Sequence, residues 1–264
     1  MRTKLVIAGV VAMLSAVAVA DGVDVGKKSV FTKFSAIPPE RLEAAAAQQY
    51  RQMLAPSKTQ GAPLPASDAQ VQRVRDIAKR LIAFTPPWNE RAKTWKWEVN
   101  LLPSAQVNAY CMPGGKIAVY TGLSAGLKLS DDELAMVMGH EIAHALREHA
   151  SERMGKQNAT SLGVGLAAAL FGLGDLGRVA ADMGSQLVLM RYGREDESEA
   201  DLVGMELAAR AGYDPRAGIT LWQKMGAASK GAPPQWLSTH PAGKTRIKDI
   251  EANLPKVMGL YERA

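Results

Sequence analysis

The sequence predicts an α+β domain that is mainly helical and carries one small β-sheet. Several stretches repeat apolar residues every three or four positions, as amphipathic helices do, and two shorter stretches near the middle have the composition of strands. The 264 residues are 47% hydrophobic and 22% charged, close to the globular average, which excludes wholesale disorder and fibrous architectures.

The first twenty residues have the pattern of a cleavable secretory signal peptide. Arg2 and Lys4 give a basic start, and the sixteen uncharged residues that follow end in the small-x-small pattern Ala18-Val19-Ala20. This run is shorter than the roughly 20 residues of a membrane-spanning helix, although an uncleaved anchor is the alternative. With no cysteine near the cleavage point, a lipoprotein is excluded. We therefore expect export to a periplasm and a mature chain that begins at Asp21.

An N-terminal helix and a linker are predicted for residues 21–66. Pro38-Pro39-Glu40 is typical of a helix start, and apolar residues at helical spacing continue to Leu54. The stretch from Pro56 to Ser67 is a loop rich in proline, serine and glycine. Residues 67–264 are expected to form the main domain.

The main domain is predicted to open with a helix that is followed by strands. The helix begins after Ser67-Asp68, which suits an N-cap, and Thr85-Pro86-Pro87 ends it. Strands are expected at Trp95–Leu102 and within Asn108–Tyr120, where Pro113-Gly114-Gly115 predicts a turn between two halves.

The charge pattern and the single cysteine exclude several classes of protein. Without the signal peptide the formal charge falls from +6 to +4, because Arg2 and Lys4 leave with it, and the other lysines and arginines are scattered. This pattern does not indicate binding to nucleic acid. Cys111 alone can form neither an intramolecular disulfide nor a Cys-cluster metal site. We expect it to be a small buried hydrophobe, with a metal-capping thiolate as the alternative.

The most specific pattern is H-E-I-A-H at residues 140–144, in an amphipathic stretch that begins at the capping-box sequence Ser130–Glu133. On a helix, residues four positions apart project from one face, so the imidazoles of His140 and His144 can converge on one Zn²⁺ ion. Glu141 is turned about 100° from His140, where it can act as a general base toward the attacking water. The alternative is a pair of buried histidines without a metal.

A catalytic zinc needs a third protein ligand, and the residues just after the motif do not supply it. The pattern with a third histidine six residues after the second is excluded, because Ala150 occupies that position. The helix is predicted to end near His149, which we expect to face solvent.

An acidic stretch at residues 194–201 predicts another helix and supplies candidate ligands. Glu197 and Asp201 are four positions apart and share a face, so Glu197 can complete the ligand set while Asp201 accepts a hydrogen bond from a ligand imidazole. The helix dipole also favours acids in a first turn, and spacing alone does not distinguish Glu197 from its acidic neighbours.

Together these motifs resemble the gluzincin metalloendopeptidase family that includes the CAAX prenyl protease, HtpX and the periplasmic BepA- and LoiP-type zinc proteases. The resemblance rests on H-E-I-A-H, on E-S-E-A-D at residues 197–201, on Ser238-Thr239-His240-Pro241 and on Asn108–Ile117. It spans roughly Leu42 to Ile250 and is strongest with the soluble, exported branch. It implies a zincin-like fold with the small sheet beside the H-E-x-x-H helix, one zinc ion per chain and hydrolysis of peptide bonds.

The resemblance also implies the roles of single residues. Glu197 would join His140 and His144 as the third zinc ligand. Glu141 would be the general base, Asp201 an acidic partner in the site, and His240 the group that stabilises the tetrahedral intermediate.

The expected substrates are polypeptides. The sequence has no counterpart of the transmembrane helices of the prenyl protease and HtpX, so prenylated substrates are not expected. We expect a monomer that cleaves unfolded or unassembled envelope proteins, held extended against an exposed edge strand at Lys116–Tyr120. The alternative is a zinc-stabilised, chaperone-like binding protein of the envelope without proteolysis. Glu141 distinguishes the two, because a purely structural zinc needs no base.

Residues 155–190, between the two zinc-bearing helices, are the hardest to interpret. The thirteen residues Leu162–Gly174 are all apolar or glycine, too few to span a membrane. We expect a mobile lid over the cleft or a peripheral membrane contact, because glycine weakens helices by about 1 kcal/mol each. Close helix packing through small residues is the alternative.

Overall fold

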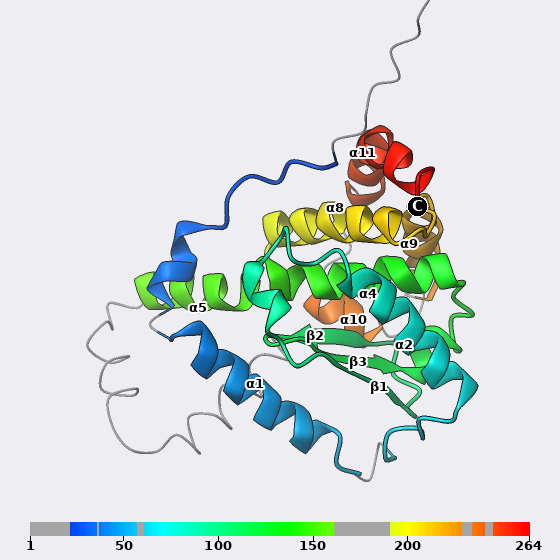
Figure 1. The fold of residues 1–264 in the computed structure, drawn as a ribbon, viewed down its shortest axis with the longest axis horizontal. Coiled ribbons are helices and arrows are strands. Elements are labelled where there is room, and N and C mark those ends of the chain that lie inside the picture. Colours follow the sequence, from blue (N-terminus) through cyan, green and yellow to red (C-terminus); the bar gives the residue numbers. More distant parts are fainter. Residues whose placement is uncertain (1–21, 36, 57–60, 161–190, 229–233, 241–244) are drawn as a thin grey trace, which may run out of the picture.

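The computed structural model describes residues 22–264 except residues 36, 57–60, 161–190, 229–233 and 241–244. These residues confirm the predicted fold class, a mainly helical protein with a small sheet (Figure 1). The signal peptide and residues 161–190 of the expected lid lie outside them, so both stay predictions, as does the domain boundary near residue 66. In the part of the chain that is described, no helix combines the length and apolar character needed to cross a membrane.

The sheet has three strands, β1 (Glu98–Leu102), β2 (Ala109–Met112) and β3 (Lys116–Tyr120), in the order β1-β3-β2. β1 runs parallel to β3, with Val99 opposite Ile117, and β2 runs antiparallel to it, with Cys111 opposite Ile117. The strands lie within the predicted stretches. However, the prediction that Lys116–Tyr120 is an edge strand is wrong, because β1 pairs with its second side. The strands at the two edges of the described sheet are β1 and β2.

The turn between β2 and β3 lies at the predicted position and depends on two glycines. Gly114 and Gly115 have φ angles of +82° and +77°, which glycine adopts without steric cost. A Cβ atom on Gly115 would also lie 2.6 Å from the ring of Trp97. These residues therefore fix the hairpin and the register of its strands.

Alternate side chains of the sheet pack against different helices. Leu101, Ile117 and Val119 belong to the same buried cluster as residues of α2 (Ala69–Ile82) and α4 (Asp131–Leu146). Ala118 and Tyr120 face the other way and pack with residues of α1 (Pro39–Met53). Figure 1 shows the sheet between α1 and α4. Because both faces are covered, the sheet provides a rigid base for α4.

Helix α4 begins as predicted at a capping box. The Ser130 side chain accepts a hydrogen bond from the Glu133 N–H (3.2 Å), and the Glu133 carboxylate accepts one from the Ser130 N–H (2.8 Å). The helix ends at Leu146, before the predicted end at His149. Glu148 then adopts a φ of +61°, and α5 (His149–Thr160) begins after it.

Helix α8 (Arg194–Arg210) lies against α4 on the side away from the sheet (Figure 1). A Cβ atom on Gly139 of α4 would lie 2.7 Å from the carbonyl oxygen of Gly204 on α8. In turn, a Cβ atom on Gly204 would lie 2.6 Å from the backbone nitrogen of His140. The backbones of the two helices are therefore in direct contact, immediately beside the first histidine of the motif.

Residues 23–28 extend from α8 to the turn that follows α4 and contact both. The Val23 N–H donates to the Glu206 carboxylate at 2.6 Å, and the Gly26 carbonyl accepts from Arg147 at 3.1 Å. The Lys28 ammonium forms an ion pair with Glu148 at 2.6 Å. The remaining described elements are η1 (Val30–Phe34), η2 (Glu90–Lys93), α3 (Thr121–Ser124), α9 (Ala217–Ala228), α10 (Gln235–Thr239) and α11 (Arg246–Tyr261).

The contact between the helices predicts the effect of one methyl group. Gly204→Ala should force α4 and α8 apart and lower the free energy of unfolding by about 1–3 kcal/mol. Gly226→Ala on α9 is the matched control, because no atom lies within 4 Å of the added Cβ and alanine favours the helix. Urea denaturation of both variants measures this difference. Stability of Gly204→Ala equal to that of the wild type would contradict the close approach.

Candidate metal centre

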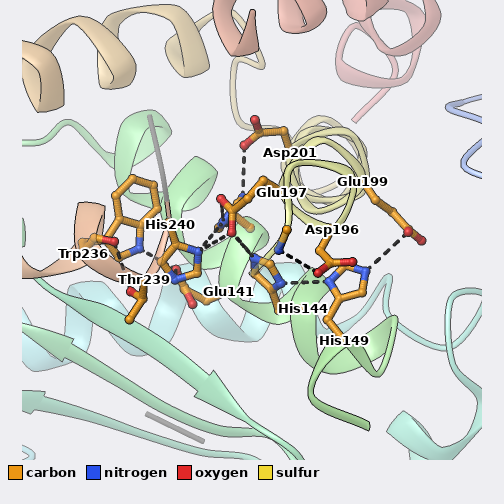
Figure 2. A network of polar contacts seen from close by, with 12 residues as sticks. Glu141, His144, His149, Asp196, Glu197, Glu199, Asp201, Trp236, Thr239 and His240 are labelled. Atoms are coloured by element: carbon orange, nitrogen blue, oxygen red, sulfur yellow. Dashed lines mark hydrogen bonds and ion pairs between the residues drawn. The ribbon is translucent and has the colours of Figure 1, made fainter. Parts of the chain in front are cut away.

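Four side chains from three elements bring their donor atoms together. His140 and His144 lie on α4, Glu197 lies in the first turns of α8, and His240 follows α10. Figure 2 shows the side chains of His144, Glu197 and His240 close together. The Nε2 atom of His140 lies 3.1 Å from Nε2 of His144 and 3.2 Å from Nδ1 of His240. The Glu197 carboxylate lies 3.6 Å from Nε2 of His140, 3.5 Å from Nε2 of His144 and 3.0 Å from Nδ1 of His240.

The spacing of the donors fits a tetrahedral zinc site. Zinc bound at ~2.0–2.1 Å places its ligand atoms about 3.3 Å apart, and the separations here are 3.0–3.6 Å. The four residues are at most 3% exposed. Imidazole nitrogens and a carboxylate oxygen are donors that zinc accepts, so the residues present fit this metal.

The pKa values of the clustered side chains also favour the binding of a cation. Burial lowers the pKa of His144, which favours the neutral ring that can bind a metal. Burial raises the pKa of Glu197, but hydrogen bonds from His144 and His240 outweigh it and hold that pKa well below its usual range. Burial likewise lowers the pKa of His240, yet the negative charges of Glu141 and Glu197 leave it raised. The cluster thus stabilises positive charge at its centre.

Asp201 lies where the sequence analysis placed it. Its Oδ1 atom is 3.0 Å from Nδ1 of His140, so it can accept the hydrogen bond that leaves Nε2 free for the metal. Burial raises the pKa of Asp201, but Arg246 and His140 outweigh this effect and lower it, so Asp201 is a carboxylate.

Arg246 is part of the site and was missed by the sequence analysis. It donates to Oε2 of Glu197 at 2.6 Å and to both oxygens of Asp201 at 2.5 Å. Its guanidinium lies over the ring of Trp222, 3.8 Å from the centroid. No local pattern singles out an arginine at the start of α11, because its role depends on how that helix packs against α8.

Glu141 lies beside the donor set without belonging to it. Its Oε1 atom accepts a hydrogen bond from the indole N–H of Trp236 at 2.6 Å and lies 3.5 Å from Nε2 of His240. Trp236 also stacks on His240, with ring centroids 5.0 Å apart. Trp236 therefore orients both residues, a role that the sequence analysis did not anticipate.

His149 is buried, so the prediction that it faces solvent is wrong. It is 1% exposed, and its Nδ1 atom lies 2.8 Å from Nδ1 of His144. The prediction extended the helical periodicity of α4 to this position. The turn at Glu148 interrupts that periodicity and directs His149 toward the site.

A cavity next to the donors is bordered by the edge strand β2. Its lining consists of Asn108, Tyr110, Cys111, Met112, Pro113, Glu141, Ala150, Tyr192, Thr239 and His240. Cys111 is buried, as predicted, and burial raises the pKa of its thiol well above the usual range. It therefore behaves as a small hydrophobe of the cavity wall, and it is not one of the clustered donors.

A helix that carries H-E-x-x-H, packed against a helix that carries a candidate glutamate ligand and flanked by a small sheet, defines a zincin-like metallopeptidase. The sequence matches Peptidase family M48 over residues 68–254. The chain belongs to this family, whose metal is zinc, and the cluster of His140, His144, Glu197 and His240 is the candidate site for it.

Similar proteins include mitochondrial metalloendopeptidases and a bacterial protease. The chain is 36% identical to mitochondrial metalloendopeptidase OMA1 of Schizosaccharomyces pombe, over 73% of this chain and 56% of that protein. It is 41% identical to OMA1 of Arabidopsis thaliana, over 58% of this chain and 30% of that protein. It is 28% identical to the beta-barrel assembly-enhancing protease of Yersinia pestis, over 71% of this chain and 40% of that protein. The matched region thus spans about half or less of these relatives.

The assignment of ligands can be tested by metal analysis. His140→Ala, His144→Ala and Glu197→Ala should each lower the zinc content of the purified protein, because each removes a donor atom from the cluster. Glu195→Ala, on the exposed side of the same helical turn as Glu197, should keep the wild-type content of about one zinc per chain. Full zinc content in Glu197→Ala would show that another carboxylate is the ligand.

Proposed function

We propose that the chain is an endopeptidase that cleaves unfolded or unassembled proteins of the bacterial cell envelope. The observation that carries this proposal is the position of Glu141. Its carboxylate is buried beside the metal donors, is held by Trp236, and takes no part in the cluster itself. A zinc that only stabilised the fold would not need a carboxylate there.

In this mechanism Glu141 and Trp236 handle the proton of the attacking water. His140, His144 and Glu197 would hold the zinc, which would act as a Lewis acid toward the scissile carbonyl and the attacking water. Glu141 accepts the proton of that water as the general base. The indole N–H of Trp236 keeps the carboxylate oriented while the proton is transferred.

His240 and Asp201 act on either side of this step. His240 can stabilise negative charge on the carbonyl oxygen by donating a hydrogen bond, which its raised pKa favours. Asp201 holds His140 through its Nδ1 atom, and Arg246 in turn fixes both oxygens of Asp201. Asp201 thus keeps the ligand imidazole in one orientation.

The substrate is proposed to lie extended along β2. This strand replaces the one expected from the sequence, because β3 is paired on both sides while β2 pairs with β3 only in the described sheet. Residues 110–113 of β2 and the following turn border the cavity that also contains Glu141. A peptide that added to this edge would pass the general base with its backbone exposed.

The proposed location and substrates rest on the N-terminus and on the bacterial relatives. The signal-peptide pattern supports export to the periplasm. Two relatives are named beta-barrel assembly-enhancing proteases, from Yersinia pestis and Escherichia coli O157:H7. We propose that the chain acts there as a monomer, with residues 155–190 as the segment that covers the cleft or touches the membrane.

One substitution separates the enzyme from the alternative, a zinc-stabilised binding protein. Glu141→Gln should keep the fold, the zinc and substrate binding, because the amide is nearly isosteric and Glu141 is not a donor of the cluster. Cleavage of an unfolded protein should fall by a factor of about 10²–10⁴, the usual effect of losing a general base. Zinc-loaded Glu195→Gln is the control and should cleave like the wild type. A wild-type protein that cleaves no faster than Glu141→Gln would favour the binding protein.

Export is tested separately, by N-terminal sequencing of the protein from the envelope fraction. We expect the sequence to begin at Asp21, because signal peptidase accepts the small residues at positions 18 and 20. An intact Met1 on carbonate-resistant membranes would contradict a cleaved signal peptide and favour the anchor.

A further inference from the structure

The two ligand histidines of α4 contact different partners with their outer nitrogens. His140 uses Nδ1 to contact the Asp201 carboxylate directly at 3.0 Å. The Nδ1 atom of His144 instead lies 2.8 Å from Nδ1 of His149, and Nε2 of His149 lies 3.4 Å from Oε2 of Glu199 (Figure 2). A second imidazole therefore stands between His144 and its carboxylate.

The protons of this chain can be assigned from the chemistry of the rings. To bind zinc through Nε2, a neutral His144 must carry its proton on Nδ1 and donate it. His149 then accepts this hydrogen bond through Nδ1, so its own proton is on Nε2, which faces Glu199. The carboxylate of Glu199 favours that tautomer, because it accepts and cannot donate.

Glu199 is itself held in place at the other end. The Nε atom of Arg147 donates to Oε1 of Glu199, and the same guanidinium contacts the Gly26 carbonyl at 3.1 Å. The group at the end of the chain is therefore a carboxylate acceptor that is held in a fixed position.

The ring of His144 is also held from the side. Tyr192 stacks on it with ring centroids 4.0 Å apart and an angle of 22° between the planes. Stacking fixes the plane of the imidazole but permits a flip of the ring about the Cβ–Cγ bond. The hydrogen bond to His149 excludes the flipped ring. Stacking and the hydrogen bond together determine where Nε2 points.

We propose that His149 and Glu199 are positioning residues for the zinc ligand His144, acting as a relay that fixes its tautomer and orientation. This inference rests on the proposed role of His144 as a ligand through Nε2. It gives a role to His149, which the sequence analysis expected to face solvent. It also gives a role to Glu199, an acid near the start of α8 that the helix dipole alone would explain.

A competing explanation is a second metal site at His149, Glu152 and Asp196, whose donor atoms lie within 4.8 Å of one another. Two contacts oppose it. Both ring nitrogens of His149 already face partners, and the Lys156 ammonium lies 2.6 Å from the Glu152 carboxylate and 3.9 Å from that of Asp196. A lysine thus already compensates these two acids.

Two amide substitutions at position 149 separate positioning from simple packing. His149→Asn places its Oδ1 atom where the imidazole Nδ1 lies, so it can still accept from His144. His149→Gln places its amide further out, near the Nε2 position, so it can contact Glu199 but leaves His144 without its acceptor. Glu199→Gln removes the charge from the end of the relay, and Glu195→Gln is its matched control.

The measurement is the affinity of the purified apo-protein for Zn²⁺, determined by competition with a chromophoric chelator. His149→Gln should bind zinc about 10–100-fold more weakly than the wild type and Glu199→Gln about tenfold, as is usual for partners of ligand imidazoles. His149→Asn and Glu195→Gln should stay within about threefold of the wild type. The absorption spectrum of the Co²⁺ form should change in His149→Gln and be kept in His149→Asn.

Equal affinities of His149→Asn and His149→Gln would overturn the relay, because packing alone would then explain the burial of His149. If neither variant folds by circular dichroism, Glu199→Gln decides, and wild-type affinity there overturns the proposal. His144→Ala tests the premise, since undiminished zinc binding would remove His144 from the ligands. Because zinc affinity is measured without substrate, a failure of peptide cleavage is a separate result.

Discussion

The zinc site depends on how closely α4 and α8 approach at Gly139 and Gly204. Helix axes usually lie 8–10 Å apart, a distance that side chains at the contact determine. Here neither helix has a side chain at the contact, and each missing Cβ is replaced by backbone of the other helix. The carboxylate of Glu197 can then reach the nitrogens of His140 and His144. The sheet supports α4 from below, so this spacing is not relaxed by movement of the helix.

The same close contact creates a problem of charge. Glu141, Glu197 and Asp201 are all buried, and burial of unpaired carboxylates is costly. The described residues that contact them include one guanidinium, that of Arg246. The carboxylates outnumber this guanidinium, and a zinc ion would compensate the excess of negative charge. The fold and the metal are thus linked, because removal of zinc leaves this excess in a nearly dry environment.

Local signals were sufficient for much of this fold and site. The capping box at Ser130, the glycine turn and the H-E-x-x-H spacing depend on neighbours within a few residues, and all three lie where the sequence predicted. Long-range packing determined what the sequence did not show. The parallel pairing of β1 puts β3 in the middle of the sheet, and Arg246 reaches the site only through the packing of α11 on α8. The prediction for His149 is wrong because Glu148 adopts a left-handed backbone conformation, which ends the helical periodicity that the sequence pattern continues.

The contacts between distant parts of the chain bear on when the site can form. His140 and His240 are 100 residues apart, and the Val23 N–H binds Glu206 across 183 residues. Contacts this distant close large loops, so they form late and slow the folding of a domain. A chain that is still being synthesised lacks part of the ligand set. Folding itself therefore delays the assembly of a hydrolytic centre until nearly the whole chain is present.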